Sequence, residues 1–497
     1  MATPQTAMID DLREAFEAHP EWLLLRENGR TFPLLNHEVS ILTSGSGAMI
    51  EVLEDGGLTT FRVQQAAASG RSLSMTVTSR FGKGSELLRF TPRISDAELN
   101  EALIADRIQI AAKVSALLGD ELPGAKLRRT ALNADNDRIA EMVFEFNDKS
   151  TALALAALTD NFTSELFLTI SLEIFRKKSS RKKLPDRLLF LAGRKKLIRD
   201  VGKLIALFSE PSRRSLRLFE ISADRERIVP KRQPRMRDLW RQKAAKISLP
   251  EAVNPSETAN RILDLDRERI DIVFSKQGET LRFLGLPFAR VRRVGGHEKA
   301  WFGVERSKTQ LDPDSWGQFR ELVGELDQHR HAATSDRRHD LYRLAPEAWL
   351  ESILRRNIAK LDQNLILSPL YNQVRTTSDK LDLLALRRDG RLVIIELKTS
   401  PDRQAVFQAA DYWRKIELQR RSGELQAAGA FGDREILDMP ALVYIAAPAL
   451  SFHREFERFA RMLSDEIELW RFELHQDWRK SIRVLSRKNY AGGFTNL

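Results

Sequence analysis

Three charged side chains stand at the ends of two apolar runs in the last quarter of the chain. The runs, 383–386 and 392–395, flank an Asp-Gly dipeptide that is typical of a tight turn, so they predict a buried β-hairpin. Asp382, Glu396 and Lys398 break this apolar pattern. An ionised group in such a setting must be paired with another charge or bound to a metal. The three residues are therefore the first candidates for chemistry.

Strand geometry predicts how these side chains point. Glu396 and Lys398 are two residues apart, so they lie on the same face of one strand. If Asp382 lies across the hairpin from Glu396, two carboxylates and an ammonium meet. Two hard oxygen donors suit Mg²⁺, and a neighbouring lysine can orient the water that attacks phosphorus. The alternative is a structural ion pair at a strand end, with Asp382 as an edge residue.

This stretch resembles the core of the PD-(D/E)XK, or restriction-endonuclease-like, nuclease superfamily. Asp382 matches the aspartate of the motif, and Glu396-Leu397-Lys398 matches its E-x-K, while Leu381 stands where the motif has proline. The resemblance implies that Asp382, Glu396 and the backbone carbonyl of Leu397 bind Mg²⁺, for which Mn²⁺ can substitute. It also implies that Lys398 orients the nucleophile.

The segment upstream of the hairpin predicts an amphipathic helix. Residues 346–357 begin with a proline, which favours a helix start, and carry apolar residues at helical spacing. Members of the superfamily commonly place a glutamate on this first helix that completes the metal site. The resemblance assigns that role to Glu351, which borders the apolar stripe, with Glu347 as the alternative.

A second helix is predicted over 402–421, downstream of the hairpin. Gln408 and Tyr412 are four residues apart, so one helix face carries both. They match the Gln-x-x-x-Tyr motif of the helicase-associated exonuclease branch of the superfamily, which implies a role in aligning the substrate. A strand at 441–446 follows. The expected fold class is α/β, with a C-terminal restriction-endonuclease-like αβββαβ core that is preceded by α+β domains with antiparallel sheets.

The length and composition limit the remaining possibilities. A chain of 497 residues exceeds a single core, and its net charge of +11 favours polyanionic partners. With no cysteine it has neither disulfides nor a thiolate zinc site. It also has no apolar run long enough to span a membrane and no secretory signal. We therefore expect a cytoplasmic protein without membrane contact.

Changes in texture along the chain suggest four regions. We expect an α+β domain with an antiparallel meander at 1–170, a basic helical region and linker at 171–255, a small α+β domain at 256–335 and the nuclease domain at 336–497. Individual elements expected within them are helices at 9–26, 95–118 and 314–331, and short strands at 270–275, 280–285, 288–291 and 300–304. The apolar runs between 138 and 175 fit either a helix or a strand.

Two clusters of basic residues lie in the middle of the chain. The first spans 176–199, and the second spans 231–246 around Trp240. They predict either a surface that follows a nucleic-acid backbone or an ordinary solvated face of a basic protein.

These features together predict a Mg²⁺-dependent deoxyribonuclease that serves DNA repair, recombination or defence. Endonuclease and exonuclease action both remain open. A nucleic-acid-binding or assembly protein that keeps the nuclease fold without cutting is the alternative. A single active site that has to cut two strands favours a homodimer.

Overall fold

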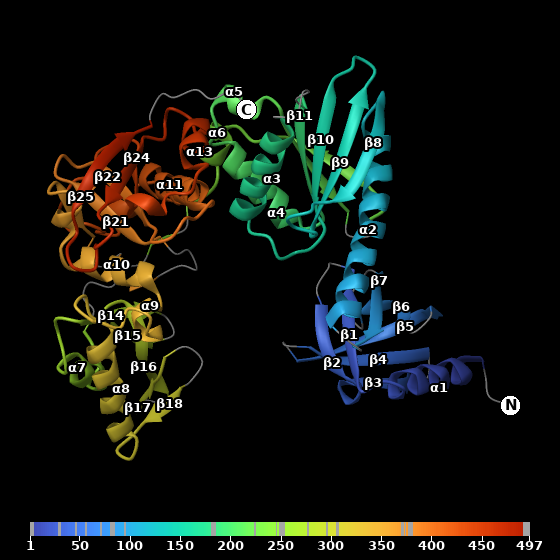
Figure 1. Cartoon of the computed structure of the whole chain (residues 1–497), viewed down its shortest axis with the longest axis horizontal. Coiled ribbons are helices and arrows are strands. Elements are labelled where there is room, and N and C mark those ends of the chain that lie inside the picture. The colour runs from blue at the N-terminus through green and yellow to red at the C-terminus, as the bar shows by residue number, and fades with distance from the viewer. Residues whose placement is uncertain are drawn as a thin grey trace. The chain divides into compact units, whose positions relative to one another are not determined.

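The structure is a computed structural model of the chain. It describes residues 4–27, 31–44, 47–54, 57–69, 72–79, 85–93, 96–179, 185–222, 225–244, 246–247, 254–275, 278–294, 297–304, 308–368, 372, 374–375 and 381–490. Helices combine with antiparallel and mixed sheets (Figure 1), so the predicted α/β class is confirmed. Of the described helices, none is both long enough and apolar enough to cross a membrane.

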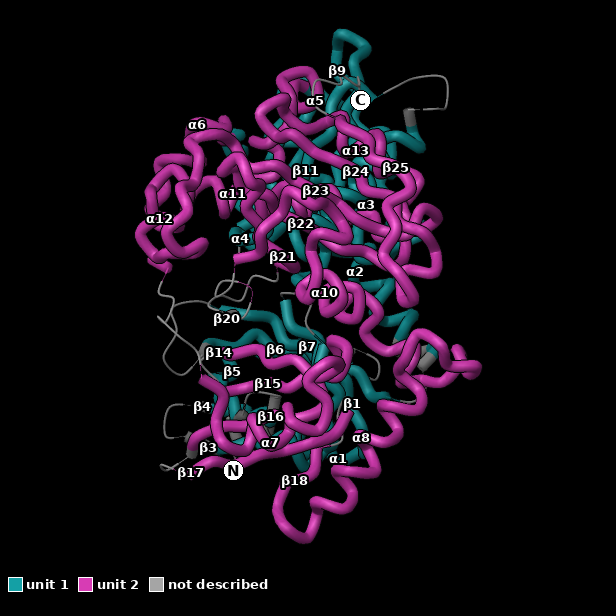
Figure 2. The backbone as a smooth tube through the Cα atoms, turned by 90° about the vertical axis from the view of Figure 1, so that its left-hand side faces the viewer, with its two compact units in different colours: residues 1–202, 215–233 teal, residues 203–214, 234–497 magenta. Residues whose placement is uncertain are grey.

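The chain forms two compact units (Figure 2). Unit 1 contains Met1–Gly202 and Ser215–Gln233, and unit 2 contains Lys203–Arg214 and Pro234–Leu497. Each unit contains two sheets.

The first sheet of unit 1 is antiparallel throughout and packs against the first helix. Its strand order is β2-β1-β7-β6-β5-β4-β3, so β3 to β7 form the predicted meander. The helix expected over 9–26 is wrong in its second half, because α1 ends at Glu17 and a buried strand starts at Glu21. The elements are α1 (Pro4–Glu17), β1 (Glu21–Arg26), β2 (Thr31–Leu35), η1 (Asn36–Glu38), β3 (Val39–Ser44), β4 (Gly47–Glu54), β5 (Gly57–Ser69), β6 (Ser72–Ser79) and β7 (Ser85–Pro92).

The second sheet of unit 1 is mixed, with the order β13-β12-β11-β10-β9-β8. The helix predicted from 95 is confirmed as α2, whose Val114 and Leu118 pack on the sheet beside Met142 and Phe144. The apolar runs of undecided type become β9, β10 and α3. The elements are α2 (Asp96–Glu121), β8 (Ala125–Leu132), β9 (Ile139–Phe146), β10 (Thr151–Ala157), α3 (Ser164–Ser179), β11 (Arg187–Ala192), α4 (Lys195–Ile205), β12 (Leu216–Ile221) and β13 (Ile228–Lys231). The end of α4 and the short helix α5 (Glu210–Arg213), which precedes β12 in the chain, belong to unit 2.

The first sheet of unit 2 has the order β18-β17-β16-β15-β14-β20 and is covered by helices. The strands and the helix expected between 270 and 331 are confirmed, with shifts of a few residues at their ends. The elements are α6 (Met236–Leu239), α7 (Glu257–Leu263), β14 (Ile270–Ser275), β15 (Gly278–Phe283), β16 (Leu286–Val294), β17 (His297–Phe302), β18 (Thr309–Leu311), α8 (Trp316–His329), α9 (Asp340–Arg343) and β20 (Val374–Arg375).

The second sheet of unit 2 contains the predicted hairpin. Its order is β19-β21-β22-β23-β24-β25, and the pairs β22/β23 and β23/β24 are parallel. The elements are α10 (Pro346–Arg356), η2 (Ile358–Lys360), β19 (Leu365–Leu367), β21 (Leu383–Arg387), β22 (Leu392–Leu397), α11 (Ala405–Arg421), α12 (Glu424–Ala427), β23 (Leu442–Pro448), η3 (Ala449–Ser451), α13 (Phe456–Met462), β24 (Leu469–Leu474) and β25 (Val484–Asn489).

Apolar side chains explain why β21 and β22 sit in the middle of this sheet. Every residue of β22 is buried, and Leu383, Val393 and Ile395 join one core with Trp349 and Leu350 of α10. A strand that is apolar on both faces is stable only where both faces are covered. The hairpin therefore holds Glu396 in a buried position, with Asp382 half-buried beside it.

Candidate active site

The hairpin sets Asp382 beside Glu396. Leu383, the first residue of β21, lies opposite Ile395, so one step further along the pair brings Asp382 across from Glu396. The Asp382 side chain turns toward the neighbouring strand, where its Oδ2 accepts a hydrogen bond from the backbone N–H of Leu397 at 2.7 Å. The aspartate is thus tied to the backbone between the glutamate and the lysine.

Lys398 completes the group on the same face as Glu396. Its Nζ lies 3.0 Å from Glu396 Oε1 and 3.0 Å from Asp402 Oδ2. Glu396 is 3% exposed and Lys398 is 8% exposed, so the ion pair is largely removed from water. The structure therefore brings the aspartate, the glutamate and the lysine together at one end of the hairpin.

Burial and crowding shift the acid–base properties of both carboxylates. Burial, then the charge of Glu396 and also that of Glu351, raises the pKa of Asp382 well above its usual range. Burial raises the pKa of Glu396 to about 7, even though Lys398 opposes the shift. Strong shifts of this kind, in two carboxyl groups that share a site, are typical of functional centres.

The lysine stays charged. Burial alone would lower its pKa, but the charges of Glu396, Glu347 and Asp402 raise it overall. Lys398 is therefore a fixed positive charge and not a general base at neutral pH.

The polar atoms of the site fit a divalent metal. Glu396 Oε2 and Gln408 Oε1 are buried without a hydrogen-bond partner. In a strand, the N–H and C=O of one residue point the same way, so the Leu397 carbonyl lies on the side of Asp382. Two carboxylates and one carbonyl, with waters, form the kind of set that Mg²⁺ accepts. Within the described residues, no three His, Asp or Glu side chains form a metal-binding group by themselves.

The helix α10 brings two further acids, one turn apart. Glu351 influences the pKa of Asp382, but Arg282 Nη1 at 3.2 Å and Arg355 Nη1 at 3.4 Å already bind its Oε1. Glu347 instead acts on the pKa values of Glu396 and Lys398. The structure thus places the expected Glu351 beside Asp382 but inside an arginine pair, and the alternative Glu347 beside the E-x-K.

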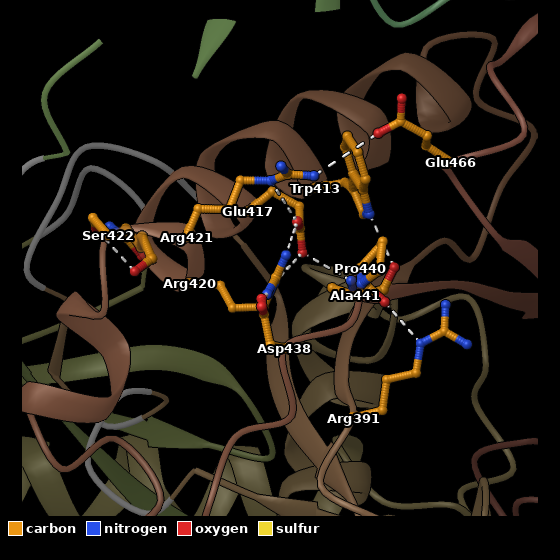
Figure 3. Close-up of polar contacts among 11 residues, drawn as sticks. Arg391, Trp413, Glu417, Arg420, Arg421, Ser422, Asp438, Pro440, Ala441 and Glu466 are labelled. Atoms are coloured by element: carbon orange, nitrogen blue, oxygen red, sulfur yellow. Dashed lines mark hydrogen bonds and ion pairs between the residues drawn. The ribbon is translucent and has the colours of Figure 1, made fainter. Parts of the chain in front are cut away.

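Gln408 and Tyr412 both lie on α11 and are partly exposed. A buried polar cluster at the C-terminal half of this helix fixes its position (Figure 3). Glu417, which is fully buried, accepts hydrogen bonds from Arg420 Nη2 at 2.8 Å and from the backbone N–H of Ala441 at 2.8 Å. Trp413 Nε1 donates to the Ala441 carbonyl. These bonds join α11 to the start of β23, next to β22.

Two features of the site were not predicted. Asp402 follows Lys398 by four residues and pairs with it from the loop before α11. An acid at that spacing after the lysine was the available signal. Arg282 comes from β15, where it also pairs with Asp271 Oδ1 at 2.6 Å. No local pattern could have indicated a contact with Glu351 from so far along the chain.

The second basic cluster has a structural component. The ring of Trp240 packs edge to face on Trp413 at 5.8 Å between centroids, and the guanidinium of Arg421 lies 4.5 Å from the Trp240 ring. Trp240 is therefore engaged within unit 2.

Comparisons with known proteins gave limited results. No protein-family model matches the chain, and no curated protein matches its sequence. Two of the solved structures that match are apo EndoMS and a repair endonuclease from Pyrococcus abyssi. The first is 12% identical, covers 40% of this chain and 92% of its own, and gives a TM-score of 0.13. The second is 11% identical, covers 45% and 98%, and gives a TM-score of 0.15. TM-scores this low establish neither a shared fold nor a shared function.

Proposed function

We propose that unit 2 is a metal-dependent nuclease that hydrolyses phosphodiester bonds in DNA. The observation that carries this proposal is the convergence of Asp382 and Glu396, two carboxyl groups with raised pKa values, on the buried ammonium of Lys398. A divalent cation would remove the repulsion that remains between these two carboxylates beside the single ammonium of Lys398. The resemblance of the E-x-K stretch to DNA-cutting enzymes supports DNA as the substrate, as does the net charge of +11.

The ligands would be Asp382, Glu396 and the carbonyl of Leu397, with a further carboxylate from α10, either Glu351 or Glu347. A bound Mg²⁺ or Mn²⁺ would supply Lewis-acid activation of the scissile phosphate and of the attacking water. The chain's own residues do the rest. Lys398, held by Asp402, would orient the water and offset the charge that builds on phosphorus.

The helix α11 would contribute substrate positioning. Gln408 carries a buried side-chain oxygen without a hydrogen-bond partner. It lies in the N-terminal half of α11, which begins at Ala405, shortly after Asp402. Tyr412 lies one turn further along the same helix. The hydrogen bond between Glu417 and Ala441 anchors α11 beside β23, so it would hold this face of the helix in place during the reaction.

A second candidate function has its own supporting observation. Lys398 is engaged by both Glu396 and Asp402, at 3.0 Å each. A closed ion-pair network of this kind would also suit a protein that keeps the fold but only binds nucleic acid. The two candidates differ in one respect, because only the first requires a divalent metal for its effect on DNA.

Incubation of the full-length protein with linear, closed circular and single-stranded DNA distinguishes them. We expect DNA loss with Mg²⁺ or Mn²⁺ and none with chelator. Asp382→Asn and Lys398→Met should each abolish it. The matched control is Asp389→Asn, in the turn at the other end of the same hairpin, where the side chain is 48% exposed. Metal-independent binding without cleavage would favour the second function.

A further inference from the structure

One sheet in each unit has the same strand order and the same strand directions. In unit 1, β8, β9 and β10 are antiparallel neighbours, β10, β11 and β12 are parallel neighbours, and β13 closes the sheet antiparallel to β12. In unit 2, β19, β21, β22, β23, β24 and β25 repeat this order and these directions.

The helices repeat as well (Figure 1). The helix α2 precedes the first sheet as α10 precedes the second, and α3 and α4 occupy the connections that α11 and α13 occupy in unit 2. Each of these two sheets is itself preceded by an antiparallel meander of five consecutive strands, β3 to β7 in unit 1 and β14 to β18 in unit 2. The repeat therefore extends over most of both units.

The hairpin turns fix the register between the two copies. In unit 2, Arg387 N–H donates to the Arg391 carbonyl, and the side chain of Asp389 accepts from the N–H of Arg391 at 3.1 Å. In unit 1, the N–H of Phe146 donates to the carbonyl of Ser150, and Asp148 accepts from the N–H of Ser150 at 2.9 Å. Turns with the same hydrogen bonds, and with an aspartate at the equivalent position, thus join β9 to β10 and β21 to β22.

The ladders carry this register across the sheet. Counting from the turn aligns Leu397 with Ala156. Leu397 pairs with Ala446, which pairs with Phe472, and Ala156 pairs with Leu191, which pairs with Phe219. Both chains of partners end on a buried phenylalanine of the third parallel strand. One register therefore satisfies the hairpin and both parallel pairs.

This register identifies what stands in unit 1 at the positions of the candidate catalytic residues. Counting from the turn, Asp382 corresponds to Glu141, Glu396 to Leu155 and Lys398 to Ala157. The structure shows Glu141 directly opposite Leu155 in the ladder. Leu155 is fully buried and Ala157 is 7% exposed. One acid of the three charged residues is retained, while the glutamate and the lysine are replaced by apolar side chains.

The remaining acid is neutralised by its own surroundings. Lys178 of α3 places its Nζ 2.9 Å from Glu141 Oε2, and Asn133 Nδ2 donates to Glu141 Oε1 at 2.5 Å. Both carboxylate oxygens are thus engaged by donors of the protein. In unit 2, by contrast, Glu396 Oε2 has no partner.

We infer that the chain is a tandem duplication in which the core of unit 1 is a non-catalytic copy, so that all hydrolysis occurs at the single site of unit 2. This inference rests on the proposed function. A single site per chain cuts one strand in each reaction, so a chain that acts alone converts a closed circular duplex into a nicked circle. A linear duplex then requires a second, independent cut.

The test compares equivalent residues of the two copies in the full-length chain. Asp382→Asn and Glu396→Gln should lower Mg²⁺-dependent cleavage more than about 100-fold, because they remove ligands and not outer partners. Glu141→Gln, the matched control in unit 1, should retain cleavage within about twofold, since the inference assigns no ligand to unit 1 and Lys178 and Asn133 already engage both oxygens of this carboxylate. Thermal unfolding of each variant shows that it is folded.

The time course on closed circular DNA supplies the second readout. Nicked circles should accumulate before linear molecules, at a rate proportional to enzyme concentration. Cleavage that survives Glu396→Gln and disappears when Glu141→Gln is added would overturn the inference, as would linear product formed without a nicked intermediate by a protein that sedimentation shows to be a monomer. A wild-type protein that cuts no DNA with Mg²⁺ or Mn²⁺ would overturn the proposed function itself, and this inference with it.

Discussion

Asp382 accepts a hydrogen bond from the backbone N–H of Leu397 at 2.7 Å. The bond links the carboxylate that precedes β21 to the residue between Glu396 and Lys398 at the end of β22. This bond ties the position of the first acid to the register of β21 and β22. A shift of one residue would turn every side chain of a strand to the opposite face. The apolar core on both faces of the hairpin opposes such a shift, so the sheet itself maintains the spacing of the charged residues.

The first prediction concerns the stability of Glu396→Gln. The raised pKa of Glu396 means that the ionised form is disfavoured in the folded protein. Glutamine resembles the protonated form, so the metal-free variant at pH 8 should unfold at the same temperature as the wild type or a higher one. Cleavage should nevertheless be lost. A melting temperature clearly below that of the wild type would show that the ion pair with Lys398 contributes more than the burial of the carboxylate costs.

The second prediction follows from the same shift and concerns pH. The pKa of Glu396 rises from 4.5 to about 7 on folding, so between these values the folded protein binds more protons than the unfolded chain. The contribution of Glu396 to the free energy of unfolding of the metal-free protein should therefore be largest below pH 4.5. It should fall as the pH rises toward 7. Urea unfolding at constant ionic strength measures the slope, which Glu396→Gln should reduce.

Metal should reverse this trend. Since Mg²⁺ or Mn²⁺ must displace protons from the carboxyl groups, the increase in melting temperature on adding either ion should be larger at pH 8 than at pH 6. Equal increases at both pH values, or the same increase in Glu396→Gln, would place the bound ion elsewhere.

Local sequence patterns were sufficient for the parts of the fold that depend on neighbours in the chain. The hairpin follows from two apolar runs around Asp389-Gly390, and Gly390 indeed adopts a φ of 89° that favours glycine. The periodicity of apolar residues predicted α10 within one residue of its observed end at Arg356. The helix over 402–421 is observed from Ala405, after the loop that holds Asp402.

Patterns failed where tertiary pairing decides. The run Glu21–Arg26 continues the apolar character of the helix before it, yet it forms a strand because β2 and β7 pair with it on both sides. Likewise β11 lies between two basic stretches, and its apolar residues Leu188 to Ala192 are buried between β10 and β12. The duplication was hidden for the same reason, since it lies in strand order and register and not in shared motifs.

The fourth prediction separates the two acids of α10. Glu351 is held by Arg282 and Arg355, so Glu351→Gln weakens two buried ion pairs and should lower stability by roughly 1–3 kcal/mol. Glu347 acts on Glu396 and Lys398, so Glu347→Gln should weaken metal-dependent cleavage by about 10–100-fold with little change in melting temperature. Cleavage and thermal unfolding measured on both variants decide. The reverse pattern would return the metal-binding role to Glu351.

The last prediction concerns the anchor of α11 (Figure 3). Glu417 is fully buried and accepts from Arg420, Arg421 and the N–H of Ala441. Glu417→Gln removes the buried carboxylate that both guanidinium groups share, while Arg420 keeps Asp438 and Arg421 keeps Glu466 as partners, so the free energy of unfolding should fall by about 1–3 kcal/mol. Glu435→Gln, on an exposed residue after α12, should change it by less than about 0.5 kcal/mol. Urea unfolding of the two variants measures the difference. Equal stability of both would mean that α11 docks on β23 through Trp413 and its apolar face alone.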